Sequence, residues 1–465
     1  MSKKNKNRRF IEQKKSTGDT TRKNFVTKDG KSPVPPEPVG DRVRMLISPI
    51  VLPPMVNAAC PSLMEPFGIE FMITHGTASL PDQSDKSEFR ALHIAADHAG
   101  CGWWRFHEIE DVVNYSKKGY ILNTGLRLPR EYLLSVKFDA IRLQRQVGPG
   151  RAEYWKNIKE MFRETNTNTR MIFEVDDVIC KDKLPEFNEA KDSFNDDKVQ
   201  ESLHQMLDIC DEMFVVSPYM RQVYRKYHQS CDISVIPNFA SRAWFDGYYD
   251  LEKRMKDFDK HKYRPRILLP GGATHVNQYD RNIYSESDYT RVVDAIISAR
   301  HDFEFVIMGV QPNVFRSFIE NGEMTYIRWA PQYLYPQVLN NLGVQCVIAP
   351  LADNEFNRSK SSIKWQESCY MGFGFAGQRL EPYTEARHLF DAGPELIDLL
   401  KSITKDEQTF EEEVKYNRSQ AEKYWIDDKI DDIITLYKTP YADPARKEIK
   451  WFVDLNPAQF GVQKK

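Results

Sequence analysis

Three charged residues, Lys360, Lys364 and Glu367, have the side chains and the spacing that a nucleoside diphosphate requires. They stand at positions i, i+4 and i+7, so on a helix all three share one face. Lys360 and Glu367 would lie about 10 Å apart along the axis, which is comparable with the reach from a diphosphate to the ribose hydroxyls. The spacing therefore predicts a nucleotide-diphosphate site. The alternative is a solvated helix face on which Glu367 pairs with Lys364.

The elements that position these residues can be read from the surrounding sequence. An apolar run, Val344 to Ala349, is typical of a buried parallel strand, and Pro350 with a polar loop follows it. We expect a helix to begin near Ser359 to Ser362. The free N–H groups and the positive dipole end of that helix would favour phosphate beside the lysines.

The same segment resembles the donor-site signature of GT-B glycosyltransferases, particularly family 4 and its bacterial and phage relatives. The likeness implies that Lys360 and Lys364 face the leaving diphosphate and that Glu367 holds the ribose. It also implies donor contacts from Asn357 and Ser361. The chain matches the pattern P-L-x-D-N-x-F-N-x-x-K-S-x-x-K-x-x-E at Pro350, Leu351, Asp353, Asn354, Phe356, Asn357, Lys360, Ser361, Lys364 and Glu367.

One position departs from the wider family. Those proteins carry two glutamates eight positions apart, and the first would fall at Ser359. Its donor-sugar contact would then come from the loop, through Asp353, Asn354 or Glu355.

Composition indicates a globular protein without an obvious charged partner. The 465 residues allow two domains of ordinary size, and 65 Lys and Arg nearly balance 67 Asp and Glu. The sequence has no apolar run long enough to span a membrane and no apolar signal core, so we expect a cytoplasmic protein, in the host cell if phage-encoded. Seven cysteines without a C-x-x-C pair support neither a disulfide framework nor a zinc ribbon.

We expect an α/β fold with two Rossmann-like domains facing a cleft. Residues 1–40, with eleven Lys or Arg against four Asp or Glu, form a disordered basic arm and Pro-rich linker, which serves solubility or slides on nucleic acid. The first domain, which would bind the acceptor, covers 41–245, a connector 246–264, and the donor domain 265–400. Helices in 401–465 would pack back toward the first domain. First-domain strands are expected at Val43–Ile47, Ile69–Ile73, Ala140–Leu143, Met171–Val175 and Met213–Val216.

Adjacent carboxylates, Asp176 and Asp177, end the strand FEVDD. Functional groups of open α/β sheets collect outside the carboxyl ends of strands, and the pair resembles a strand end of many GT-B enzymes. Either residue would orient the acceptor or act as its base, with Asp177 the candidate for catalysis. A turn cap is the alternative. His107, near Trp103 and Trp104, is a further acceptor-side candidate, and we expect no metal site.

The second domain opens with a glycine-rich loop, RPRILLPGGATH. Gly271 and Gly272 allow close approach of a ligand, although a Gly-Gly pair is often only a turn. The family has such a loop near the diphosphate, which implies donor contacts from Gly271, Gly272, Thr274 and His275, and the loop pattern also matches at Asp280. The loop after the third strand, with Arg328 and Trp329, is implied to approach the base.

These features together predict transfer of a sugar from a UDP- or GDP-sugar to a hydroxyl group, with no further cofactor. Lys360, Lys364 and the helix N-terminus would stabilise the charge that develops on the leaving diphosphate. Family 4 members retain the anomeric configuration, so the likeness implies a retaining hexosyl- or pentosyltransferase. The acceptor stays open between a glycan, a metabolite and a hydroxymethylated pyrimidine in phage DNA. A nucleotide-sugar epimerase and a non-catalytic nucleotide-sugar-binding protein are the other readings.

Overall fold

The computed structural model describes residues 89–449, except 98, 124–132, 135, 166, 273 and 277–285. Within them the chain forms two sheets, each of six parallel strands. The expected basic arm, the two earliest strands and Asp280 lie outside the described residues. The two α/β sheets confirm the predicted fold class.

The strands of the first sheet run in the order β2-β1-β3-β4-β5-β6. This order places β1 between β2 and β3, which is where a doubly wound sheet reverses its direction of growth. Three of these strands, β3, β4 and β5, confirm predicted ones to within a residue. The strands are β1 (Arg90–Ile94), β2 (Tyr120–Asn123), β3 (Ala140–Gln144), β4 (Arg170–Glu174), β5 (Glu212–Val215) and β6 (Ile233–Val235).

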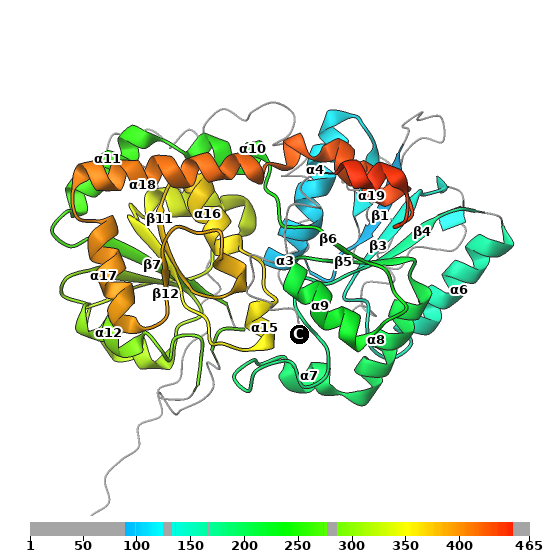
Figure 1. Ribbon diagram of the computed structural model, residues 1–465, viewed down its shortest axis with the longest axis horizontal. Coiled ribbons are helices and arrows are strands. Elements are labelled where there is room, and N and C mark those ends of the chain that lie inside the picture. Colours follow the sequence, from blue (N-terminus) through cyan, green and yellow to red (C-terminus); the bar gives the residue numbers. More distant parts are fainter. Residues whose placement is uncertain are drawn as a thin grey trace, which may run out of the picture. The chain divides into compact units, whose positions relative to one another are not determined.

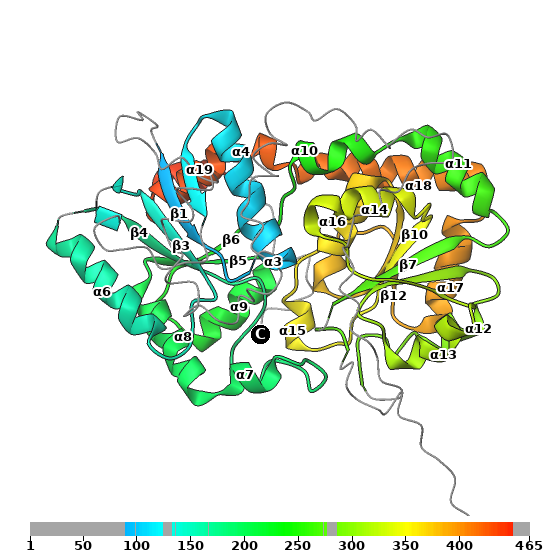
Figure 2. The same ribbon diagram turned by 180° about the vertical axis from the view of Figure 1, so that it is seen from behind.

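Helices cover both faces of the first sheet (Figures 1 and 2). Trp155 of α6, Met206 of α8 and Val223 of α9 share one apolar cluster with Ile141 of β3, whereas α4 belongs to a second cluster. Burial on both faces explains why strands such as Arg170–Glu174 are buried along their whole length. The helices of this part are α3 (Gly100–Gly102), α4 (Glu108–Ser116), α6 (Arg151–Glu164), α7 (Lys191–Asn195), α8 (Asp197–Ile209), α9 (Pro218–Tyr227) and α10 (Arg242–Phe245), with a π-helical turn at Trp103–His107.

The second sheet has the strand order β12-β11-β10-β7-β8-β9. Numbered from β7, this is the 3-2-1-4-5-6 order of the dinucleotide-binding fold, with the reversal between β7 and β10. Arg266 pairs with Glu304 and Cys346 with Ile267, which fixes the parallel registers around β7. The strands are β7 (Arg266–Gly271), β8 (Glu304–Gly309), β9 (Thr325–Ile327), β10 (Cys346–Ala349), β11 (Gly374–Gln378) and β12 (Leu389–Phe390).

Apolar clusters also lie on both faces of this sheet. Ile296 of α12 and Leu400 of α17 pack on one side, and Leu339 of α14 and Trp365 of α16 belong to the cluster on the other. The segment predicted as a charged connector contains a helix, α11. The remaining helices are α11 (Leu251–His261), α12 (Val293–Ser298), α13 (Arg316–Glu320), α14 (Tyr335–Asn341), α15 (Glu355–Arg358), α16 (Ile363–Met371), α17 (Gly393–Ile403), α18 (Glu407–Gln420) and α19 (Ile430–Lys438).

The last two helices contact different sheets. Helix α18 runs along α11 and α16, and α19 lies beside α4 (Figure 1). Tyr437 of α19 bonds through its hydroxyl to His93 and Arg142, both fully buried strand residues of the first sheet, at 2.8 Å each. Arg142 in turn forms a buried ion pair with Glu174 at 2.6 Å. The end of the described chain is thus built into the core of the first sheet.

No helix among the described residues is both long enough and apolar enough to cross a membrane.

Candidate functional site

The loops after β7 and β10 lie at the point where the second sheet reverses. β7 and β10 are neighbours in the sheet, and their carboxyl ends carry the segments 272–276 and 350–362. Ligands of open α/β sheets bind outside the carboxyl ends of strands at such a switch point. His275, which is far from Lys360 and Lys364 in sequence, meets both lysines there.

A turn separates Lys360 from the helix that carries Lys364 and Glu367. Asn354 caps the short helix α15 by accepting from the N–H of Asn357, and Ser359 then bonds back to Glu355. The chain makes a turn before α16, whose N-cap is Ser362 and whose first residue is Ile363, so the helix begins within one residue of the predicted range Ser359 to Ser362. Lys360 therefore lies in a turn, whereas Lys364 and Glu367 lie on α16. The sequence did not reveal the turn between α15 and α16, because the serines of this segment are compatible with several helix N-cap positions.

His275 is held by a buried carboxylate, Asp288. Its Nδ1 lies 2.6 Å from Asp288 Oδ2, and its Nε2 lies 3.2 Å from Lys364 Nζ. Burial, Lys360 and Lys364 lower the pKa of His275 to about 3, so the ring is neutral at physiological pH. A neutral ring that donates from Nδ1 has an acceptor at Nε2, which suits the ammonium group of Lys364.

Asp288 joins the two loops of the switch point. Its Oδ1 accepts hydrogen bonds from the N–H of Ala352 at 2.9 Å and from Asn357 Nδ2 at 2.5 Å. Burial alone would raise the pKa of Asp288, but Lys360, with its Nζ 3.8 Å away, and His275 outweigh burial and lower it. Asp288 is therefore an ionised and fully buried counter-ion for the lysines.

The surroundings of Lys364 destabilise its ammonium form. Burial and the nearby charge of Lys360 lower its pKa to about 7, against the raising effect of Asp288 and Glu367. Two ammonium groups thus face a neutral imidazole and one ionised aspartate. Ser362, the N-cap of α16, makes no capping hydrogen bond with its side chain. The first N–H groups of the helix therefore do not donate to this side chain. This surplus of positive charge and N–H donors favours an anion.

Glu367, one turn further along α16, is buried and bonded to Tyr335. The Tyr335 hydroxyl donates to Glu367 Oε2 at 2.9 Å. Burial raises the pKa of Glu367 to about 8, although Tyr335 and Lys364 lower it. The ring of Tyr335 lies 6.0 Å from that of Trp329, which is 45% exposed. An exposed aromatic ring therefore lies next to the predicted ribose-binding group.

The glycines at the end of β7 have different surroundings. A Cβ at Gly271 would lie 1.9 Å from the hydroxyl oxygen of Tyr289, whereas a Cβ at Gly272 would meet no described atom within 4 Å. Gly271 is therefore required by packing within the protein. Gly272 leaves open space beside His275, as a ligand-binding loop needs.

The remaining residues predicted to contact the nucleotide sugar differ in their burial and in their contacts. Asn357 is fully buried and bonds Asp288 and the carbonyl of Ala352. Thr274 and Ser361 are partly exposed, beside His275 and in the turn before α16 respectively. Arg328 is exposed at the end of β9. A donor contact by each of these residues stays a prediction.

The carboxyl end of the first sheet carries the other predicted cluster. Asp176 and Asp177 follow β4, and Arg145 follows the neighbouring strand β3. Arg145 Nε lies 3.6 Å from Asp176 Oδ1, and Arg145 also pairs with Asp97, which follows β1. Burial and the charge of Asp176 raise the pKa of Asp177 to about 7, while Lys360 and Arg145 lower it. These residues surround the switch point of the first sheet.

The loop after β10 contacts the first-sheet part of the chain. Ser217, the N-cap of α9, donates to the carbonyl oxygen of Ser359 at 2.7 Å. Phe356 is fully packed in the apolar cluster of the first sheet, and Lys360 Nζ lies 4.9 Å from its ring centre. This docking brings Lys360 into electrostatic contact with Asp177.

The three loop residues considered as replacements for the glutamate at position 359 have protein partners. Asp353 pairs with Arg358 at 2.6 Å, and Glu355 pairs with Lys183. Asn354 caps α15. Ser359 itself is fully buried and bonds the carbonyl of Glu355.

His107 ends the π-helical turn. Its Nδ1 is 3.4 Å from Asn123 Nδ2 and 3.5 Å from Glu110, and its ring contacts Trp103. An acceptor-side role for His107 stays a prediction.

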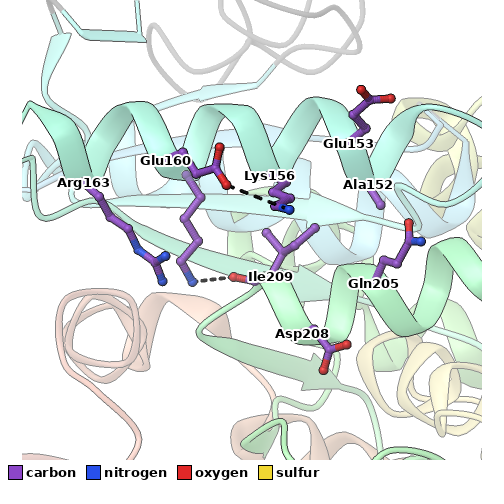
Figure 3. A pocket seen from close by; sticks show the side chains of 9 residues that line it. Ala152, Glu153, Lys156, Glu160, Arg163, Gln205, Asp208 and Ile209 are labelled. Atoms are coloured by element: carbon purple, nitrogen blue, oxygen red, sulfur yellow. Dashed lines mark hydrogen bonds and ion pairs between the residues drawn. The ribbon is translucent and has the colours of Figure 1, made fainter.

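A depression of about 520 Å³ lies elsewhere, between the outer surfaces of α6 and α8 (Figure 3). Lys156, Lys159, Glu160 and Asp208 are among its lining residues, and none of the predicted site residues is. Its lysines have partners, since Lys156 is 4.0 Å from Glu160 and Lys159 is 2.7 Å from Asp211. We therefore place the candidate site at the strand ends. In the described ranges, no group of three or more His, Cys, Asp or Glu is arranged to hold a metal ion.

Sequence reasoning missed three residues of this site. Asp288 follows His275 by thirteen positions in a stretch without a recognisable motif, and Arg145 and Tyr335 come from other loops. Arg145 has a φ of +45°, unusual for a residue other than glycine, but φ is not visible in the sequence. Only the position of Arg145 directly after an apolar strand was a usable signal.

Fold and site together define a two-domain α/β protein with a cation-rich site at the switch point of its second sheet. No protein-family model matches the chain, and no curated protein shows significant similarity to it.

Several solved structures are distantly similar. They include the trehalose-6-phosphate synthase OtsA, with 11% identity over 67% of this chain and 74% of that chain and a TM-score of 0.41. A TarM variant from S. aureus in complex with Fondaparinux, α-GlcNAc-glycerol and UDP has 10% identity, 67% and 58% coverage, and a TM-score of 0.44. The S. aureus MnaA–UDP co-structure has 10% identity, 75% and 96% coverage, and a TM-score of 0.41. The strand orders, rather than these likenesses, define the fold.

Proposed function

We propose that the protein is a glycosyltransferase that moves a sugar from a UDP- or GDP-sugar to a hydroxyl acceptor. The observation that carries the proposal is the pair of lysines at the switch point of the second sheet. Lys360 and Lys364 both face His275, with Asp288 as their ionised counter-ion among the described residues. A diphosphate would supply the missing negative charge. The resemblance of this segment to family 4 glycosyltransferases supports the same function and a retaining outcome.

In the proposed reaction, the bond between the anomeric carbon and the diphosphate oxygen breaks, and the diphosphate leaves with the electron pair. Lys360, Lys364 and the N-terminus of α16 stabilise that charge, which is greater in the transition state than in the bound donor. Glu367 binds the ribose, and Trp329 stacks on the base. A new bond forms between the anomeric carbon and the acceptor oxygen.

The acceptor proton goes to Asp177. This carboxylate follows β4, is in electrostatic contact with Lys360, and has a pKa of about 7. A base with a pKa near the working pH is suited to proton transfer. A diphosphate bound beside Lys360 would offset the cation that lowers the pKa of Asp177, which makes the Asp177 carboxylate a stronger base toward the acceptor hydroxyl.

A nucleotide-release assay with a panel of UDP- and GDP-sugars, with and without mixed acceptors, tests the proposal. We expect UDP or GDP release that falls at least 100-fold in Lys364→Ala and in Glu367→Ala. Lys401→Ala is the matched control, because Lys401 is 59% exposed on α17. Release that Lys364→Ala leaves unchanged would overturn the proposal. An isomerised nucleotide sugar without nucleotide release would identify an epimerase instead.

A further inference from the structure

The carboxyl end of the first sheet has the opposite charge to that of the second. Asp97 follows β1, and Asp176 with Asp177 follows β4. Arg145 follows β3, the strand between these two, and is the cation among the three aspartates. Three carboxylates therefore surround one guanidinium group. A hydrogen bond holds the backbone of Arg145 in place, since its N–H donates to the carbonyl oxygen of Glu174 at 2.9 Å.

The carboxylate oxygens of this cluster differ in whether they accept hydrogen bonds from the described residues. Asp97 Oδ1 accepts from the N–H groups of Ala99 at 2.9 Å and Gly102 at 3.1 Å, and Asp97 Oδ2 pairs with Arg145. Asp176 differs, because its side chain is only 10% exposed and its Oδ1 accepts no hydrogen bond from the described residues. Arg145 Nε, 3.6 Å away, is an ion-pair partner beyond hydrogen-bond distance. Asp176 Oδ1 therefore has capacity to accept a hydrogen bond from a ligand.

The thiol of Cys101 adds no charge to this cluster. Burial and the charge of Asp176 raise its pKa well above the ordinary value, so it stays a neutral thiol. Besides Arg145, the charge of Lys360 acts on Asp177, and the diphosphate would engage Lys360. A ligand at the first sheet therefore meets a surplus of hydrogen-bond acceptors and negative charge.

We propose that this end of the first sheet binds the acceptor as an uncharged polyhydroxyl compound, whose neighbouring hydroxyl groups donate to Asp176 and Asp177. An acceptor with a phosphate or carboxylate close to the reacting hydroxyl is rejected, because its charge would face the aspartates. Selection by unfavourable like charges is a common source of specificity. The inference rests on the proposed function for the second sheet, but it concerns a separate set of residues.

Matched pairs of sugars test this inference. Ligand-observed NMR would measure binding of D-glucose, D-mannose, D-galactose and N-acetyl-D-glucosamine, each against its own 6-phosphate, with and without UDP or GDP. We expect at least one neutral sugar to bind tenfold or more tightly than its phosphate. Asp176→Asn should reduce that ratio at least fivefold, whereas Asp192→Asn, at an exposed position on α7, should leave it unchanged.

The outcomes distinguish a failure of this inference from a failure of the proposed function. Tighter binding of a 6-phosphate, or a hydroxymethylated DNA duplex that binds tightly while all neutral sugars do not, would overturn the inference. A ratio that Asp176→Asn leaves unchanged would overturn it as well. Binding of a neutral sugar that depends on Asp176, without binding of either nucleotide, would instead support the inference and refute the proposed function. Circular dichroism of Asp176→Asn would verify its folding.

Discussion

The Nε2 atom of His275 lies 3.2 Å from the ammonium group of Lys364, and the opposite ring nitrogen lies 2.6 Å from Asp288. Asp288 thereby fixes the tautomer that can accept from a lysine. His275 positions Lys364 without adding a charge. The two lysines consequently keep their positive surplus, which is what the proposed diphosphate site requires.

Replacing Asp288 with asparagine should change how nucleotide binding depends on pH. The loss of the counter-ion would lower the pKa of Lys364 below about 7, because the charge of Asp288 raises it. We expect UDP or GDP affinity to fall about tenfold at pH 8 and to change little at pH 6, where Lys364 stays protonated. Calorimetric titration at both pH values measures this. Equal loss at the two pH values would indicate only structural damage, and Asp302→Asn, at an exposed position, is the control.

Nucleotide binding to the unchanged protein should take up a proton near neutral pH. Lys364 has a pKa of about 7 in the free site, and a bound diphosphate raises it by stabilising the ammonium form. Affinity is therefore highest below pH 7 and falls as the pH rises above it. Ionisation of Glu367, with a pKa of about 8, adds negative charge and acts in the same direction. Titrations in two buffers of different ionisation enthalpy would reveal the uptake, and its persistence in Lys364→Met would exclude Lys364 as the source.

Lys364→Met should stabilise the protein while it weakens nucleotide binding. The pKa of Lys364 is lower in the folded protein than the ordinary 10.5, so the unfolded chain binds more protons between pH 7 and pH 10.5. The penalty is complete below pH 7 and disappears as the pH approaches 10.5. We expect a gain of about 1 kcal/mol at pH 7 and none at pH 10, measured by thermal unfolding. A loss of stability at pH 7 would contradict the claim that the ammonium form of Lys364 destabilises the folded protein.

The two glycines at the end of β7, Gly271 within the strand and Gly272 after it, form a matched pair for mutation. Gly271→Ala places a methyl group against the Tyr289 hydroxyl and should destabilise the protein by about 1–3 kcal/mol. Gly272→Ala meets no described atom within 4 Å, so the free energy of unfolding should be unchanged. If this loop contacts the diphosphate, Gly272→Ala should still weaken nucleotide binding. Denaturant unfolding and calorimetry of both variants separate packing from ligand contact, and unaltered affinity in Gly272→Ala would remove that glycine from the site.

Sequence patterns predicted the fold class because alternating apolar strands and amphipathic segments report burial directly. Charge spacing singled out Lys360, Lys364 and Glu367, and the structure brings both lysines to His275, although Lys360 lies in a turn rather than on the helix. Asp288 could not be found, because its role depends on the close pairing of β7 and β10 and on a loop that returns to His275. The docking of Phe356 into the first-sheet cluster likewise depends on contacts between distant segments, which no local pattern encodes.

The central claim is that the second sheet binds a nucleoside diphosphate through Lys360 and Lys364. The most direct test is calorimetric titration of UDP, UMP, GDP and GMP into the protein and into Lys364→Ala at pH 7. We expect one diphosphate to bind at least tenfold more tightly than its monophosphate, and this difference to disappear in Lys364→Ala. Equal affinity for diphosphate and monophosphate in the unchanged protein, or a preference that survives the loss of Lys364, would contradict the claim.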